Sequence, residues 1–246
     1  MDDAMKILIL GGTGEARELA NRLFDAGHDV ITSLAGRTQD PKLPRGGLRM
    51  GKFGGIPGLS AYLRAAGIER LVDATHPYAG MMSINAVAAA QATGVPLVRY
   101  MRPAWAQQVG DHWIIVGTAA EAAAALPPSS DVLLTIGHTG LEHFLERDDC
   151  QFIVRTIEAP SMNLPRHARL LQARPPYTLE SEMALMRLEG ITHLVSKNSG
   201  GGQTEAKLEA ARRLGIKVIM IARPVYGPAT EVADIDAAIA ALALPG

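Results

Sequence analysis

Short apolar runs alternate with one-sided helical segments along most of this chain. The run Lys6–Leu10 has the length of a buried strand, and the next segment places apolar side chains on one helix face, at Ala16, Leu19, Ala20, Leu23 and Phe24. Gly27 then stands where a helix C-terminus favours a left-handed residue, and Asp29–Leu34 is a second apolar run. The pattern predicts a strand, a glycine-rich turn, a helix and a second strand.

The same alternation continues to a junction near residue 103. A helix is predicted with Pro57 in its first turn and Gly67 at its end, and a helix rich in Ala and Met is predicted to end at Gly94. Two further strands are expected, at Leu71–Ala74 and Leu97–Arg99. The run Met101-Arg102-Pro103 then interrupts the pattern and is interpreted as a domain junction.

Alternation resumes beyond the junction. A Thr118-x-x-Glu121 capping box predicts the start of a helix that Pro127-Pro128 ends, and an Ala-rich helix is expected at the end of the chain. The other predicted helices are Leu179–Glu189 and Glu205–Leu214, each followed by glycine. The predicted strands are Trp113–Val116, Val132–Ile136, Gln151–Ile157, His193–Ser196 and Lys217–Ile221.

Strands that alternate with amphipathic helices are typical of α/β proteins whose parallel sheet is covered on both faces. We therefore expect two Rossmann-like domains with mainly parallel sheets and a cleft between them. The predicted boundary divides the chain into residues 1–103 and residues 104–246.

Composition narrows the class of protein. Hydrophobic residues make up 48% of the chain, charged residues 20%, and the net charge is −1 without a block of basic residues, which argues against a nucleic-acid partner. No apolar run is long enough to span a membrane, so no membrane partner is expected. Cys150 is the single cysteine, which excludes an internal disulfide and a multi-thiolate metal site and fits a reduced, cytoplasmic setting.

The glycine-rich turn after the first strand is the first candidate site. A strand that turns sharply into a helix exposes backbone N–H groups and the positive end of the helix dipole, and glycines leave room for a phosphate there. Arg17 replaces the third glycine of the G-x-G-x-x-G pattern, so a merely tight turn is the alternative. The candidate cofactor residues are Gly11, Gly12, Thr13, Gly14, Glu15 and Ala16.

The end of the second strand carries a second candidate. NAD-specific sites place an acidic residue there for the ribose 2′-hydroxyl, whereas this chain has Ser33, Gly36 and Arg37 and no acid before Asp40. A guanidinium and a hydroxyl suit a 2′-phosphate, so NADPH is favoured over NADH. The alternative is that Arg37 is a solvated loop cation.

Two more segments in the first half are candidates for cofactor contact. Gly54 and Gly55 lie in a run of glycines that indicates either close approach of backbone to a ligand or a strained turn. A polar run follows the strand at Leu71–Ala74, where open α/β sheets bind ligands. Its candidate residues are Asp73, Ala74, Thr75, His76 and Pro77.

A second strand-to-helix turn, Lys197-Asn198-Ser199-Gly200, follows the predicted strand at His193–Ser196. Exposed N–H groups and a lysine are suited to an anionic ligand, and a flexible turn is the alternative. No Tyr-x-x-x-Lys or G-x-S-x-G pattern occurs, which argues against short-chain dehydrogenase and serine hydrolase chemistry.

Together these segments resemble the precorrin-6A reductase family of cobalamin biosynthesis. The run Asp73-Ala74-Thr75-His76-Pro77-Tyr78-Ala79 is the most specific part of the resemblance. The other matching segments, which extend to the last predicted strand, are Gly11–Ala16, Leu34–Arg37, Lys197–Gly200, Lys207–Arg212 and Met220–Pro224.

The resemblance implies an oxidoreductase acting on CH–CH groups, which reduces precorrin-6A to precorrin-6B with hydride from NADPH and a proton. It implies that residues 1–103 bind NADPH and that residues 104–246 contribute to the tetrapyrrole site. Lys197 is a candidate proton donor, with water as the alternative. The candidate substrate-binding residues are Tyr78, Arg102, Lys197, Asn198, Ser199, Gly200 and Arg223.

Two alternatives stay open. One is the cobalt-precorrin-6A reductase of the anaerobic route, and the other is a non-catalytic module that senses NADPH. The expected partner is the tetrapyrrole substrate, and the interpretation leaves room for transient contacts with neighbouring pathway enzymes.

Overall fold

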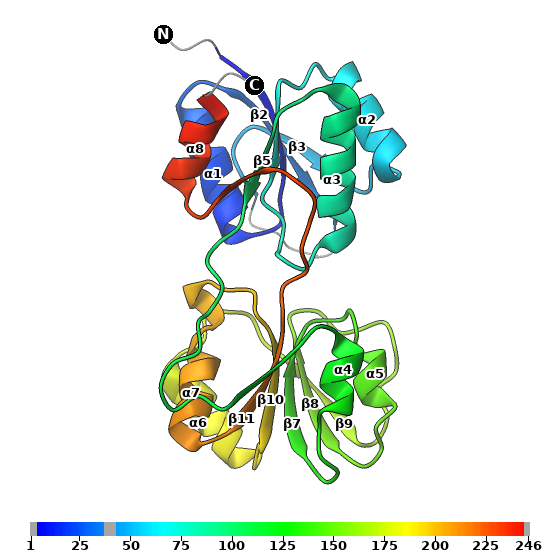
Figure 1. Cartoon of the computed structure of the whole chain (residues 1–246), viewed down its shortest axis with the longest axis vertical. Helices are drawn as coiled ribbons and strands as arrows, with labels where there is room; N and C mark the ends of the chain where they lie inside the picture. Colours follow the sequence, from blue (N-terminus) through cyan, green and yellow to red (C-terminus); the bar gives the residue numbers. More distant parts are fainter. Residues whose placement is uncertain (1–3, 37–42, 244–246) are drawn as a thin grey trace. The chain divides into compact units, whose positions relative to one another are not determined.

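The computed structural model describes residues 4–36 and 43–243. The chain divides into two compact units, each built on a six-stranded sheet (Figure 1). Unit 1 comprises Met1–Arg102 together with Pro224–Gly246, and unit 2 comprises Pro103–Arg223. All strand pairs in both sheets are parallel, which confirms the expected α/β class of two Rossmann-like domains.

The sheet of unit 1 has the strand order β12-β5-β4-β1-β2-β3. Read from β3, this is the 3-2-1-4-5-6 order of dinucleotide-binding sheets, with β12 as the sixth strand. From β1 the strands follow in chain order to one edge of the sheet, and from β4 they follow to the other edge. The loops after β1 and β4 therefore lie on either side of the topological switch point, where the strand order reverses. The strands are β1 (Lys6–Leu10), β2 (Asp29–Leu34), β3 (Gly47–Met50), β4 (Arg70–Asp73), β5 (Leu97–Tyr100) and β12 (Thr230–Val232).

Helices cover both faces of this sheet (Figure 1). On one face, α1 (Gly14–Asp25) and α8 (Ile235–Ala243) bury Leu19, Leu23 and Leu242 against the sheet. On the other face, α2 (Gly55–Ala65) and α3 (Gly80–Thr93) form a second core around Leu59 and Leu63. Strands buried on both faces have no polar side to alternate with, which is why their sequences are nearly continuous apolar runs.

Unit 2 repeats this plan in its own sheet, with strand order β6-β11-β10-β7-β8-β9. Helices α6 (Leu179–Leu188) and α7 (Ala206–Leu214) cover one face, and α4 (Ala119–Ala124) and α5 (Glu142–Leu145) cover the other (Figure 1). A short 3-10 helix, η1 (Gly202–Thr204), precedes α7. The strands are β6 (Trp113–Val116), β7 (Asp131–Thr135), β8 (Gln151–Thr156), β9 (Ala168–Gln172), β10 (His193–Lys197) and β11 (Lys217–Ile221).

The chain crosses between the two units twice, and each time it enters the next sheet as an edge strand. The chain leaves unit 1 after its fifth strand, β5, and enters unit 2 as the edge strand β6, next to β11. It leaves unit 2 after β11 and returns to unit 1 as the edge strand β12, next to β5. The prediction that residues 104–246 form one domain is therefore wrong for Pro224–Gly246, because β12 and α8 pair and pack within unit 1.

Three strands that the sequence pattern did not predict are edge strands. β3, β9 and β12 lie at sheet edges and are largely exposed or half-buried, so they carry little apolar pattern.

The expected capping box at the start of α4 differs from the prediction in one hydrogen bond. The Thr118 hydroxyl accepts from the Glu121 amide at 3.1 Å, but the Glu121 carboxylate accepts from the amide of Gly117 at 2.8 Å rather than from Thr118.

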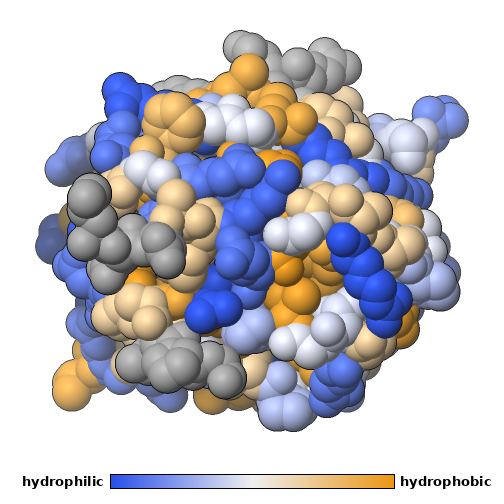
Figure 2. Space-filling view, turned by 90° about the horizontal axis from the view of Figure 1, so that it is seen from above, coloured by the Kyte–Doolittle hydropathy of each residue, from blue (hydrophilic) through white to orange (hydrophobic). Residues whose placement is uncertain are grey.

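The surface of the described residues mixes polar and apolar side chains. Figure 2 shows one face of the molecule, on which hydrophilic and hydrophobic residues are interspersed. Within residues 4–36 and 43–243, every helix is too short or too polar to cross a lipid bilayer.

A buried arginine joins the central strands of unit 1 to the returning segment. Arg99 on β5 is 1% exposed and lies in register with Asp73 of β4 and Glu231 of β12. Its Nε lies 3.6 Å from the Asp73 carboxylate, and its Nη1 donates to Glu231 at 2.8 Å and to the carbonyl of Gly227 at 3.1 Å. A charge in this position must be compensated, because water cannot reach it.

We expect Arg99→Met to lower the free energy of unfolding by about 3–5 kcal/mol, because the buried Asp73 carboxylate would lose its cation. Arg22→Met is the matched control, because the Arg22–Asp236 pair is solvent-exposed and such pairs contribute about 0–1 kcal/mol. Urea denaturation followed by circular dichroism measures both variants. Equal shifts of the unfolding midpoint would contradict the importance of the buried network.

Candidate active site

The candidate site of unit 1 lies at the switch point of its sheet. The turn after β1 and the loop after β4 meet there, as expected for segments that follow neighbouring parallel strands. The hydroxyl of Thr13 joins them: it donates to the carbonyl of Ala74 at 3.1 Å and accepts from the amide of Ala16 at 3.0 Å. Thr13 is therefore the N-cap of α1 and also the bridge between the two predicted segments.

The glycines of the turn have different roles. Gly12 has φ +116° and an added Cβ would meet nothing within 4 Å, so this glycine faces open space in a conformation that other residues rarely adopt. Gly11 lies close to β2, since an added Cβ would lie 3.0 Å from the side chain of Thr32. The buried residue on the first turn of α1 is Ala16, and Arg17 is only half-buried, so Ala16 provides the close helix–sheet contact.

Glu15 and Arg102 form an ion pair beside this turn, with 2.9 Å between Oε1 and Nη1. Burial alone would raise the pKa of Glu15, but hydrogen bonding to its own backbone amide and the charge of Arg102 hold the pKa below its usual value. The two residues line a small hollow with Thr13, Thr75 and residues 77 and 100. Arg102, predicted as a substrate residue, thus lies with the predicted cofactor residues.

The loop after β4 is held by its own polar residues. Asp73 is 2% exposed, and its carboxylate accepts from the hydroxyl of Thr75 at 2.7 Å and from the Thr75 amide at 3.3 Å. His76 is exposed, and its Nδ1 accepts from the amide of Tyr78 at 3.2 Å. A neutral imidazole that accepts through Nδ1 carries its proton on Nε2, so His76 can present an N–H donor. Pro77 is buried, and its carbonyl accepts from the hydroxyl of Tyr226 at 2.7 Å.

The carboxyl end of β2 has a neighbour that the sequence pattern did not reveal. Ser33 is buried and lies in register with Arg49 of β3, whose Nη1 is 3.5 Å from the serine hydroxyl. Gly36 follows in the turn, and Arg37 lies outside the described residues, so its predicted role stays a prediction. Arg49 was missed because β3 is a short exposed edge strand without alternation.

Gly54 and Gly55 begin α2. Both have left-handed backbones, with φ of +86° and +80°, and an added Cβ would meet nothing closer than 3.9 Å at either position. Their conformation is sufficient reason for glycine in this turn. Their predicted contact with a cofactor stays a prediction.

In unit 2, the predicted anion site lies at the matching switch point, between β7 and β10. Lys197 ends β10, and its ammonium donates to the carbonyl of Ile136 at 2.6 Å and to that of Thr139 at 3.3 Å. Burial lowers the pKa of Lys197, and the nearby carboxylate of Glu142 offsets this only in part. The lysine therefore connects the loops after both strands.

The residues after Lys197 hold the chain segments that enter and leave unit 2. The side chain of Asn198 accepts from the amide of Trp105 at 2.8 Å and donates to its carbonyl at 3.0 Å. Nε of Arg223 donates to the backbone carbonyl of Asn198 at 2.6 Å. An added Cβ on Gly200 would lie 2.0 Å from the carbonyl oxygen of Pro103, so the backbone passes as closely as glycine permits.

Ser199, the remaining predicted residue of this turn, is buried, and its amide donates to the carbonyl of Lys197 at 2.8 Å. The structure therefore brings the predicted residues Lys197–Gly200 and Arg223 together. The hydrogen bonds described above join these residues to other parts of unit 2, and contact with an anionic ligand stays a prediction.

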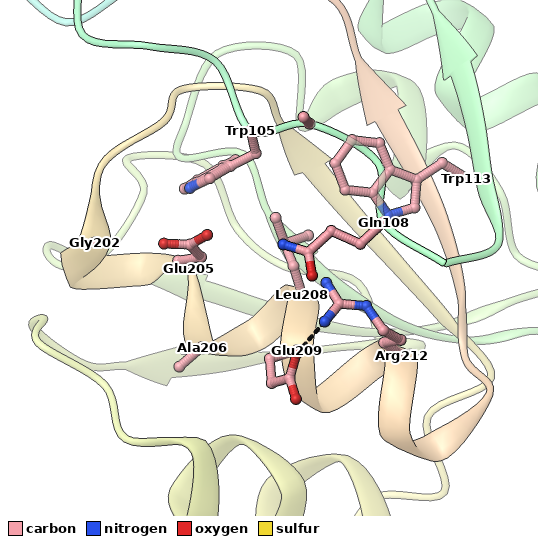
Figure 3. Close-up of a pocket in the computed structure, with 10 residues that line it drawn as sticks. Trp105, Gln108, Trp113, Gly202, Glu205, Ala206, Leu208, Glu209 and Arg212 are labelled. Atoms are coloured by element: carbon pink, nitrogen blue, oxygen red, sulfur yellow. Dashed lines mark hydrogen bonds and ion pairs between the residues drawn. The ribbon is translucent and has the colours of Figure 1, made fainter. Parts of the chain in front are cut away.

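A hollow of about 280 Å³ lies beside this turn, and none of the predicted site residues line it. Figure 3 shows the indoles of Trp105 and Trp113 with the side chain of Gln108 between them, above the N-terminal half of α7. Arg212 lies in its wall, where Asp111 and Glu209 bind the guanidinium. The cation is thus already compensated by two carboxylates.

Metal chemistry has no recognisable centre in the part of the chain that the structure describes. Within residues 4–36 and 43–243, no group of three or more His, Cys, Asp and Glu side chains is arranged to hold a metal ion. The groups that the structure shows at the two switch points include backbone N–H groups, hydroxyls, the imidazole of His76, the carboxylates of Glu15 and Asp73, and the cations of Arg102 and Lys197.

Comparison with known proteins agrees with this arrangement. The family model described as precorrin-6x reductase CbiJ/CobK matches residues 6–243, which covers both units. The chain belongs to the precorrin-6x reductase CbiJ/CobK family. The resemblance predicted from the glycine turn, the Asp73–Ala79 run and the Lys197–Gly200 turn is thereby confirmed.

Individual relatives cover almost the whole chain. A precorrin-6A reductase of Rhodococcus erythropolis is 49% identical over 238 residues, 96% of each chain. A cobalt-precorrin-6A reductase of Priestia megaterium is 32% identical over 89% of this chain and 90% of its own. The solved structure of CobK precorrin-6A reductase superimposes with a TM-score of 0.91, is 42% identical, and covers 97% of this chain and 96% of its own. The superposition with this solved structure therefore extends over nearly all of both units.

The close approach at Gly200 generates a stability prediction. We expect Gly200→Ala to lower the free energy of unfolding by about 1–3 kcal/mol, because the new methyl group would overlap the carbonyl of Pro103 and the backbone has φ +67°. Gly202→Ala is the matched control, since a Cβ there meets nothing within 4 Å. Tryptophan fluorescence during urea unfolding suits this test, because Trp105 and Trp113 both lie in unit 2. Equal free energies of unfolding for the two variants would contradict the close approach of Gly200 to the carbonyl of Pro103.

Proposed function

We propose that this chain reduces precorrin-6A to precorrin-6B in cobalamin biosynthesis, with NADPH as the hydride donor. The observation that carries the proposal is the family match over residues 6–243, combined with a glycine turn at the switch point of a sheet in dinucleotide-binding order. The activity is that of an oxidoreductase acting on CH–CH groups. In this assignment unit 1 binds the cofactor, and unit 2 contributes to the recognition of the tetrapyrrole.

The residues of unit 1 fit a dinucleotide. Open space lies beside Gly12, where a side chain would otherwise stand, and the first turn of α1 has amides that intrahelical bonds do not use. Helix N-termini of this kind bind phosphate through those amides and the helix dipole. The predicted contacts of Gly11–Ala16 and of Asp73–Pro77 with the cofactor follow from their positions in this turn and in the loop beside it.

The end of β2 supports NADPH rather than NADH. The residues Ser33–Gly36 include no carboxylate that could bind a ribose 2′-hydroxyl, and the serine hydroxyl has a guanidinium beside it. The predicted pairing of Arg37 with a 2′-phosphate belongs to this proposal as well. A cytoplasmic site of action is proposed because NADPH and the reduced thiol of Cys150 both suit that compartment.

The relatives support the metal-free substrate over the cobalt-containing one. The precorrin-6A reductase of Rhodococcus erythropolis is 49% identical to this chain, and the cobalt-precorrin-6A reductase of Priestia megaterium is 32% identical. Precorrin-6A carries several carboxylate side chains around a conjugated ring. The proposed contacts for these groups are Tyr78, Arg102, Lys197, Asn198, Ser199, Gly200 and Arg223.

When bound, NADPH supplies a hydride to one carbon of the ring, and a proton added to the neighbouring atom completes the saturation. The protein must hold the reacting carbon in reach of the nicotinamide and exclude water from it. Lys197 is the proposed proton donor, because burial lowers the pKa of its ammonium and a weaker base releases its proton more readily. The carbonyls of residues 136 and 139 hold the ammonium in place.

The activity has a direct assay. We expect the purified protein to oxidise NADPH when precorrin-6A is added, with a product two mass units heavier than the substrate, and to act more slowly on cobalt-precorrin-6A. Absorbance of the reduced nicotinamide and mass spectrometry of the ring measure both quantities. Binding of NADPH without its oxidation in the presence of precorrin-6A would instead indicate a sensing module.

The proton donor has a pH signature. A donor ammonium must be protonated, so turnover should fall as pH rises through the pKa of Lys197, and the lowered pKa moves this fall to less alkaline pH. We expect Lys197→Met to reduce kcat by about 10²–10⁴-fold. Lys197→Arg retains donors for the two carbonyls but does not titrate, so it should lose the alkaline fall. An unchanged pH profile in both variants would assign protonation to water.

A further inference from the structure

Arg49 occupies the carboxyl edge of the unit 1 sheet in a way that the established family assignment does not explain. The register of the six strands places Arg49, Ser33, Leu10, Asp73, Arg99 and Glu231 in one row across the sheet. The glycine turn begins directly after Leu10. Arg49 therefore lies two strands from the start of that turn, about 10 Å away by the usual strand spacing.

The guanidinium of Arg49 is fixed by its surroundings. Nη1 donates to the carbonyl of Gly51 at 2.7 Å, and Nη2 donates to the carbonyl of Lys52 at 2.9 Å. The group stacks on the ring of Phe53, 3.7 Å from its centroid, and lies 5.4 Å from the ring centre of Tyr62. A planar group held by two carbonyls and an aromatic ring loses little further freedom when it binds a ligand.

The positive charge of Arg49 has no carboxylate within ion-pair distance in the described residues. Other arginines of unit 1 do have such partners, namely Arg22, Arg45, Arg99 and Arg102. Among the described residues, the guanidinium donates to two neutral carbonyls and a serine hydroxyl. A half-buried, ordered guanidinium that is bound only to neutral groups keeps its full charge for an anion.

We propose that Arg49 binds the 2′-phosphate of NADPH and sets the preference for this cofactor over NADH. The inference rests on the proposed function, since it requires a dinucleotide on this sheet. In such sheets the adenosine ribose lies at the end of β2, which here carries Ser33. A phosphate on the ribose 2′-oxygen extends beyond β2, and the neighbouring strand on that side is β3, which ends at Met50, directly after Arg49.

In this proposal Ser33 and Arg49 both contact the 2′-phosphate. The guanidinium of Arg49 lies 3.5 Å from the hydroxyl of Ser33, so in this proposal both groups donate hydrogen bonds to the same phosphate. A 2′-phosphate carries close to two negative charges and accepts several charge-assisted hydrogen bonds, whereas the 2′-hydroxyl of NADH offers none of that charge. Arg49 is thus a specificity-determining residue and takes no part in hydride transfer.

Binding measurements on the protein without substrate test the assignment. Isothermal titration calorimetry would measure the Kd of NADPH, NADH, adenosine 2′,5′-bisphosphate and 5′-AMP for the wild type, Arg49→Gln and Arg49→Lys. The matched control is Arg45→Gln, which removes an exposed arginine from the same segment. We expect Arg49→Gln to weaken NADPH and the bisphosphate by about 10- to 100-fold, and NADH and 5′-AMP by less than about twofold. Arg49→Lys should recover part of the loss.

The outcomes separate the inference from the proposed function. Equal weakening of NADPH and NADH by Arg49→Gln would assign the arginine to adenine stacking or to folding, and unchanged NADPH affinity would remove it from the site. Either result overturns the role of Arg49 while the reductase assignment stands. A wild-type protein that binds neither dinucleotide would overturn the proposed function itself. Circular dichroism and the unfolding midpoint of each variant show whether it is folded.

Discussion

The buried contact between Asp73 and Arg99 is the interaction on which the candidate site of unit 1 depends. On one side, the Asp73 carboxylate orders the loop after β4 through Thr75. On the other side, Arg99 binds Glu231 and the carbonyl of Gly227, both in the segment that returns from unit 2. The shape of the loop beside the glycine turn is therefore coupled to residues more than 120 positions away in the chain.

The sequence pattern predicted the buried strands of both sheets and the apolar edge strand β6, but it did not predict the other three edge strands. Central strands such as β1 and β11 were predicted with their observed bounds, because residues buried on both faces form continuous apolar runs. β3, β9 and β12 were not predicted, because these exposed or half-buried edge strands lack the continuous apolar run that β6 retains. The missed β12 is also the reason that the end of the chain was assigned to the wrong domain.

For the candidate site, sequence motifs located the segments but not the partners of their side chains. The turns at Gly11–Gly14 and Lys197–Gly200 lie at switch points as expected, since both follow central strands. The sequence predicted Asn198 and Gly200 as substrate-binding residues, which stays a prediction, but it did not indicate the hydrogen bonds of Asn198 with Trp105 or the closeness of Gly200 to Pro103. Those contacts join residues about 95 positions apart, and a single sequence carries no local signal for them.

The late position of β12 in the chain has a consequence for biosynthesis. Strands β1–β5 of the first sheet are synthesised before unit 2, but the edge of β5 stays open until β12, which follows unit 2 in the chain, leaves the ribosome. Unit 2, which is contiguous, has all of its residues available earlier. An open parallel edge can pair with other chains. The unit whose strands are synthesised first is therefore the unit whose sheet is completed last, and loss of the segment that carries β12 and α8 would damage it selectively.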